Sequence, residues 1–256
     1  MLYRVDYLLA VIFLGTLAGS FFGKRMSSIE SSRLARGYYV AISILLLLRA
    51  LAIVGSIVLG NGSGWVKVGS FIGDAGNFLF GALFGIAMRR SNSSAFLREP
   101  AFLSSLCLWS GFAFVISGYT KAFYMQTMSD FFTQSGYSIA FLKFIMTIEV
   151  LGGIALVVPW TTIPALAGLS IDMFGAIYTH IHNGDPIHDS TGAIGQLIRL
   201  GAIVALWVLQ RESGITARSV RKAMVGVIMV AFLCLGIAVT GSILLRHAST
   251  SGAPIR

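Results

Sequence analysis

Long apolar segments constrain the fold of this 256-residue chain more than any other feature of its sequence. A helix needs about 20 mainly apolar residues to cross a lipid core about 30 Å thick, because each residue adds about 1.5 Å. Segments of roughly this length lie at 7–23, 37–59, 65–88, 102–123, 139–158, 162–181, 194–209 and 223–245. We therefore expect an all-α protein, a polytopic transmembrane bundle of about eight helices.

The composition agrees with a chain whose main surroundings are the lipid bilayer. Hydrophobic residues make up 56% of the sequence and charged residues 11%, whereas an ordinary soluble domain carries about 25% charged residues. The net charge of +9 does not indicate nucleic acid, because the basic residues lie in short stretches between apolar segments and form no continuous basic face. We expect no nucleic-acid partner.

The basic residues also predict the orientation of the chain in the membrane. Lys and Arg number four in 24–36, three in 89–100 and four in 211–222, but none in 182–193. Connections rich in Lys and Arg stay in the cytoplasm. We therefore expect a multi-pass protein of the cell membrane, in a bacterial or archaeal inner membrane, with both termini outside the cytoplasm.

Glycines spaced by four residues predict faces on which two membrane helices pack closely, because their backbones can approach each other. The glycines with this spacing are Gly15, Gly19 and Gly23 in the first segment, and Gly69 with Gly73 and Gly81 with Gly85 in the third. We expect helix contacts at these positions and infer no chemistry from them.

Two ionisable residues of the second and third segments are predicted to lie near mid-depth in the membrane. Arg49 lies about twelve residues into its segment and Asp74 about nine into the next, which runs in the opposite direction. Charged groups at this depth usually face a partner. We predict a structural ion pair between Arg49 and Asp74 that fixes how the two helices dock; a functional role is the alternative.

A second group of ionisable residues gathers in the fourth to seventh segments. Two carboxylates fall near the middle of the fifth and sixth segments, and several basic groups fall toward the outer ends of the fourth, sixth and seventh. The candidate cavity residues are Lys121, Glu149, Asp172, His180 and Arg199. Either these residues form a functional cavity or they form a purely structural polar network, and the sequence identifies no catalytic residue.

The surroundings of Glu149 and His180 refine this prediction. Gly152 and Gly153 follow Glu149 and leave room for a neighbouring helix or for a ligand. His180 and His182 superficially resemble a metal site, but their spacing does not match helical zinc motifs. We expect no metal there, and we expect a turn at 184–186.

Four short motifs in this part of the chain follow one another in a recognisable order. They are Gly118-Tyr-Thr-Lys121, Phe131-Phe132 with Gly136, Glu149-Val-Leu-Gly152-Gly153, and Met173-Phe-Gly-Ala176-Ile-Tyr-Thr-His180. The segment 102–209 thereby resembles the DoxX family of integral membrane proteins. The resemblance implies a four-helix unit in which Lys121, Glu149 and His180 are the family-like positions.

The resemblance also suggests how the chain is organised and what it does. It implies an N-terminal three-helix transmembrane segment at 1–100, a DoxX-like four-helix unit at 101–210, and a C-terminal transmembrane helix and tail at 211–256. Some similar proteins, including DoxD proteins, are linked to thiosulfate oxidation with electrons passed to quinone, and others to membrane oxidoreductase complexes. We expect a membrane subunit of a redox-linked complex that takes a quinone or a small sulfur compound.

Two other functions stay open at this point. A non-catalytic scaffold would stabilise a larger complex of membrane protein subunits through its apolar helices. A small-solute or proton-coupled transporter would use Glu149 and Asp172 as its titrating groups. Whether the chain has catalytic activity is not decided by its sequence.

Overall fold

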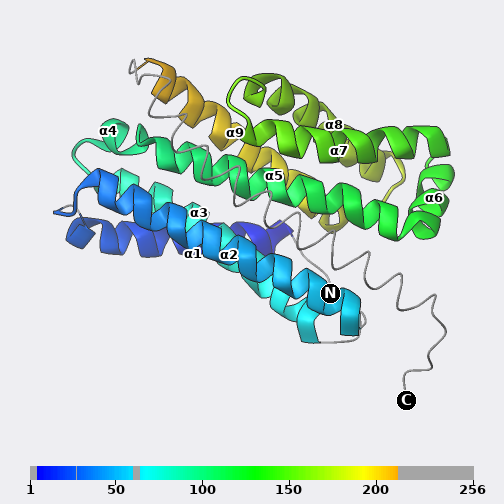
Figure 1. Ribbon diagram of the computed structural model, residues 1–256, viewed down its shortest axis with the longest axis horizontal. Coiled ribbons are helices and arrows are strands. Elements are labelled where there is room, and N and C mark those ends of the chain that lie inside the picture. Colours follow the sequence, from blue (N-terminus) through cyan, green and yellow to red (C-terminus); the bar gives the residue numbers. More distant parts are fainter. Residues whose placement is uncertain (1–4, 27, 60–63, 213–256) are drawn as a thin grey trace.

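The computed structural model describes residues 5–26, 28–59 and 64–212, and this part of the chain folds into nine α-helices and one short 3-10 helix (Figure 1). The elements are α1 (Val5–Met26), α2 (Ser31–Leu59), α3 (Gly64–Arg89), α4 (Ser93–Leu97), α5 (Pro100–Phe123), α6 (Met125–Gln134), α7 (Ile139–Val157), α8 (Thr162–His182), η1 (Ile187–Ser190) and α9 (Thr191–Glu212). The prediction of an all-α protein is confirmed.

Seven of the described helices are long and apolar enough to cross a membrane, and they correspond in order to the first seven predicted segments. They are α1, α2, α3, α5, α7, α8 and α9. The eighth predicted segment, 223–245, lies outside the described residues. The chain is therefore a multi-pass membrane protein, as its composition predicts.

Several helices extend beyond the apolar segments that predict them. α2 begins at Ser31 and not at residue 37, and α9 spans Thr191–Glu212 and not 194–209. Hydropathy detects only the stretch that lies in lipid, whereas residues such as Arg33, Leu34 and Ala35 are good helix formers and continue the helix into the polar interface. The sequence predicts the existence of a membrane helix better than its ends.

α6 is a helix that apolar length alone does not predict, because its ten residues are too few to cross lipid. Its apolar residues Met125, Met128, Phe131 and Phe132 recur at a spacing of three or four, with polar residues between them. This pattern is typical of an amphipathic helix that lies along a membrane surface. Figure 1 shows α6 across the end of the bundle, between α5 and α7.

The glycines of α1 and α3 bring these two helices into backbone contact. A Cβ atom on Gly15 would collide with the backbone of Phe78, and one on Gly81 would collide with the backbone of Ile12. The predicted helix contact is thus confirmed for these glycines. It is wrong for Gly73, where an added Cβ would meet no atom within 4 Å.

α5 occupies the centre of the described structure (Figure 1) and positions the site described below. It packs against α2 on one side and against α7 and α9 on others. Its side chains Leu106, Leu108, Trp109 and Phe114 are fully buried. Because protein and not lipid surrounds most of α5, polar groups near its C-terminal end can find protein partners.

Candidate functional site

A buried ion pair joins the C-terminal part of α5 to the middle of α7. The Lys121 ammonium group donates to both carboxylate oxygens of Glu149 at 2.7 Å. The Ser117 hydroxyl donates to Glu149 Oε1 at 2.9 Å and accepts a hydrogen bond from Lys121 Nζ at 2.9 Å. The Glu149 side chain is only 1% exposed and that of Lys121 21%, so the pair is largely removed from solvent.

Local sequence explains why these groups meet. Ser117 and Lys121 are four residues apart on one helix and so lie on the same face. α5 and α7 can approach closely because glycine has no side chain. A Cβ atom on Gly111 would lie only 2.5 Å from the Gly153 carbonyl oxygen. The room that Gly153 leaves beside Glu149 is therefore taken by a neighbouring helix, one of the two alternatives that the sequence left open.

Asp172 brings a second carboxylate to this pair from α8. Its side chain is 9% exposed, and it lies close enough to interact electrostatically with Glu149 and Lys121. Its Oδ2 atom is buried and has no hydrogen-bond partner among the described residues. We refer to Lys121, Glu149 and Asp172 as the acidic cluster, because it contains two carboxyl groups and one ammonium group, of which Lys121 and Glu149 are directly bonded.

The predicted cavity residue His180 makes its contacts at the end of α8. Its Nδ1 atom lies 2.8 Å from Asp185 Oδ2, and its ring lies 5.6 Å from that of Phe131 on α6. The predicted turn follows at once, because Gly184 has a positive φ of 73°. His180 therefore joins the loop and α6 at the end of the bundle, and within the described part of the chain it makes no hydrogen bond or ion pair with the acidic cluster.

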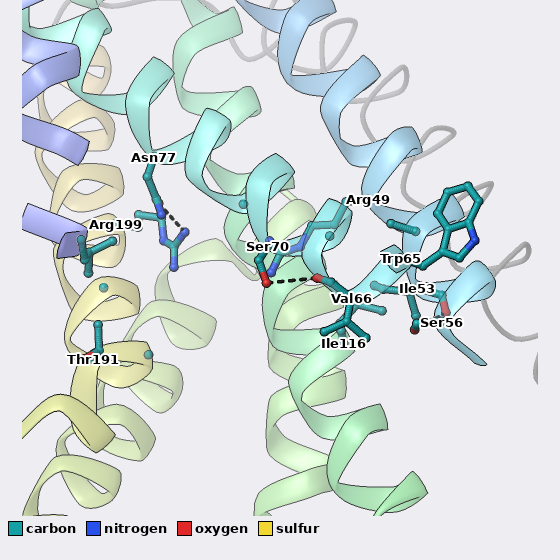
Figure 2. Close-up of a pocket in the computed structure, with 16 residues that line it drawn as sticks. Arg49, Ile53, Ser56, Trp65, Val66, Ser70, Asn77, Ile116, Thr191 and Arg199 are labelled. Atoms are coloured by element: carbon teal, nitrogen blue, oxygen red, sulfur yellow. Dashed lines mark hydrogen bonds between the residues drawn. The ribbon is translucent and has the colours of Figure 1, made fainter. Parts of the chain in front are cut away.

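The fifth predicted cavity residue, Arg199, lies in a different cavity. Its Nη1 atom donates to Asn77 Oδ1 on α3 at 3.1 Å. Figure 2 shows Arg199 and Arg49 among the residues that line a pocket of about 470 Å³. The single cavity expected from the sequence is thus divided into the acidic cluster, the His180 end and the Arg199 pocket.

Arg49 and Asp74 each contact other residues. The Arg49 guanidinium group lies 5.4 Å from the centre of the Trp109 ring, and the Tyr7 hydroxyl donates to Asp74 Oδ2 at 3.3 Å. Their predicted ion pair stays a prediction. Sequence reasoning did not single out Ser117, although its position four residues before Lys121 was a usable signal.

The fold and the site define a class of protein, a polytopic α-helical membrane protein with a buried acidic cluster in its central helices. Comparison with protein families matches residues 105–206 to the DoxX-like family. The match runs from α5 to α9, contains the whole acidic cluster, and confirms the resemblance to the DoxX family. Comparisons with curated proteins and with solved structures gave no match.

Proposed function

We propose that the chain is a membrane subunit of a redox-linked complex and that its acidic cluster binds a quinone or a small sulfur compound. The observation that carries this proposal is the buried Asp172 Oδ2 atom, which has no hydrogen-bond partner among the described residues. A buried carboxyl oxygen left without a partner costs about 1–3 kcal/mol. Such a cost is tolerated where a bound ligand or a proton supplies the missing partner.

The charges of the cluster support proton-linked chemistry. One ammonium group on Lys121 cannot neutralise two carboxylates, and charges in lipid surroundings are costly when they are not balanced. The cluster is neutral only when one carboxyl group, on Glu149 or Asp172, holds a proton. A quinone takes up two protons and two electrons when it becomes a quinol, so a group that holds a proton at this depth suits that reaction.

The residues of the cluster fit distinct roles in binding such a ligand. The Asp172 oxygen without a partner can accept a hydrogen bond from a hydroxyl group of the ligand. Lys121 already donates to Ser117 and to both oxygens of Glu149, so it attracts the ligand through its charge. In this proposal a partner subunit supplies the electrons that reduce a quinone or takes up those that a sulfur compound loses on oxidation. The chain supplies binding, orientation and proton transfer.

Four further elements of the proposal concern the organisation of the chain. The two termini lie outside the cytoplasm, the acidic cluster lies toward that same outer side, and Arg49 with Asp74 forms the structural ion pair of the N-terminal three-helix segment. The units 1–100, 101–210 and 211–256 divide the chain. The charges of the connecting segments support this arrangement.

Purification of the full chain in a mild detergent, followed by mass spectrometry of bound subunits and lipids, tests the proposal. We expect a bound quinone or sulfur compound, together with at least one redox-active partner subunit. A stable partner complex that contains neither compound would favour the scaffold function instead. Protein that carries no partner and no ligand would contradict the proposal.

A further inference from the structure

A pocket of about 470 Å³ lies between the N-terminal helices and α9, and no residue of the acidic cluster lines it (Figure 2). Its described walls come from α1, α2, α3, α5 and α9. Of these elements only α5 and α9 belong to the DoxX-like segment. The pocket therefore differs in place and in composition from the site proposed above.

Two arginines give this pocket its charge. Arg49 enters from α2 and Arg199 from α9, and both line the pocket (Figure 2). None of the described lining residues is acidic. The buried Arg199 guanidinium group carries a charge that is costly inside a membrane protein, and an anion bound beside it would offset that cost.

The Arg199 side chain has hydrogen-bonding capacity to spare for such an anion. One nitrogen, Nη1, donates to Asn77, but Nε is buried without a hydrogen-bond partner among the described residues. A guanidinium group presents several donors in a planar fork that matches phosphate and carboxylate oxygens. Neutral hydrogen-bonding side chains complete the polar lining: Ser56, Ser70, Asn77 and Thr191.

Glycines and apolar side chains set the shape of the pocket. Gly73 lines it, and a Cβ atom added there would meet no atom within 4 Å, so the glycine leaves the space open. Leu8, Ile53 and Trp65 contribute apolar walls. The pocket thus combines a cationic centre with apolar flanks, which suits an anionic group attached to an apolar molecule.

The pocket extends from one end of the bundle inward to Asn77, near the middle of α3. Leu8 is near the start of α1, Ser56 near the end of α2, Trp65 near the start of α3, and Thr191 is the first residue of α9. Lipid phosphates lie at the level where membrane helices end, so a lipid headgroup can enter the pocket from this end.

We propose that the pocket between Arg49 and Arg199 binds a phosphate-type anion. The anion is either the headgroup of an anionic phospholipid or a soluble phosphate compound, and both present the same oxygens to the two guanidinium groups. The proposal is independent of the quinone or sulfur compound at the acidic cluster.

The test compares lipid retention by the full chain and by three variants. Protein reconstituted with equal amounts of phosphatidylglycerol and phosphatidylcholine is returned to detergent, and the retained lipids are counted by native mass spectrometry. A second arm measures the thermal midpoint of lipid-depleted protein with and without inorganic phosphate. Arg199→Gln removes the charge, Gly73→Leu fills the pocket, and Gly201→Leu adds the same side chain at an open position of α9 outside the pocket.

We expect the wild type and Gly201→Leu to retain phosphatidylglycerol in preference to phosphatidylcholine. In Arg199→Gln and Gly73→Leu the ratio of the two retained lipids should fall at least about tenfold. A midpoint raised by phosphate without a lipid preference, and lost in the same two variants, would identify a soluble anion as the ligand. Wild-type protein with neither response would overturn the proposal. Anion binding that survives in Gly73→Leu would also overturn it, and this variant decides the question even if Arg199→Gln fails to fold.

Discussion

Gly111 on α5 and Gly153 on α7 face each other backbone to backbone. A Cβ atom on Gly111 would lie 2.5 Å from the Gly153 carbonyl oxygen, and one on Gly153 would lie 2.6 Å from that of Gly111. Real Cβ atoms are not found so close to a carbonyl oxygen, so this pair sets how near α5 and α7 can approach. The same approach brings Lys121 within 2.7 Å of Glu149.

Gly153→Ala should therefore destabilise the protein by about 1–3 kcal/mol, because the added methyl group must push two backbones apart. Thermal unfolding in detergent measures this change. Gly168→Ala is the matched control, since its added Cβ atom would meet no atom within 4 Å. Equal midpoints for the two variants would show that the close approach at Gly153 is not needed.

Lys121→Met should destabilise the fold because it leaves the Glu149 carboxylate buried without its cation. Removing one partner of a buried ion pair costs about 3–5 kcal/mol. The double variant Lys121→Met with Glu149→Leu should regain most of this loss, since no buried charge remains from the pair. If the double variant unfolds as easily as Lys121→Met, the two residues are not coupled.

Arg49→Ala should lower the yield of folded protein if Arg49 and Asp74 form the predicted ion pair, with a similar cost of about 3–5 kcal/mol. An Arg49→Leu, Asp74→Leu double variant should then fold better than the single variant. Size-exclusion chromatography in detergent gives the folded fraction. A double variant that is no better than the single one would rule out the pair.

A reporter fused after Arg90 should be cytoplasmic, and one inserted near Asp185 should be external. The connecting segment 89–100, which contains Arg90, has three Lys and Arg residues, whereas the segment 182–193, which contains Asp185, has none. Basic segments resist translocation. Paired phosphatase and fluorescent-protein fusions read the two sides. An external reading after Arg90 would show that the whole bundle has the opposite orientation in the membrane.

The sequence alone is sufficient to predict the membrane helices and several of the positions at which they pack closely. Apolar length predicts spanning helices directly, because the lipid core has a fixed thickness. The four-residue spacing of glycines around Gly15 and around Gly81 likewise predicted close helix contacts at these positions, and the structure shows that the two helices in contact are α1 and α3. In contrast, α6 is too short for that criterion, and only the spacing of its apolar residues could have indicated it.

The candidate site was harder to predict, because depth along a helix says nothing about direction around it. Lys121 and Glu149 were expected to share a cavity with Arg199, which lies at a suitable depth. Arg199 instead contacts Asn77 of α3, since its direction depends on which face of α9 packs against that helix. Such packing between distant segments is a tertiary property that a single sequence does not give.

The most direct test of the proposed ligand site is the quinone or sulfur-compound content of purified Glu149→Gln, measured beside its thermal midpoint. The substitution preserves the shape of the side chain but removes its charge and its ability to exchange a proton. If the acidic cluster binds a proton-linked ligand, the variant should still insert and fold, with a lower thermal midpoint because Lys121 loses its anionic partner. It should also lose at least about 90% of the bound ligand, equivalent to the loss of one charged hydrogen bond. A Glu149→Gln protein with wild-type ligand content and wild-type stability would contradict the account.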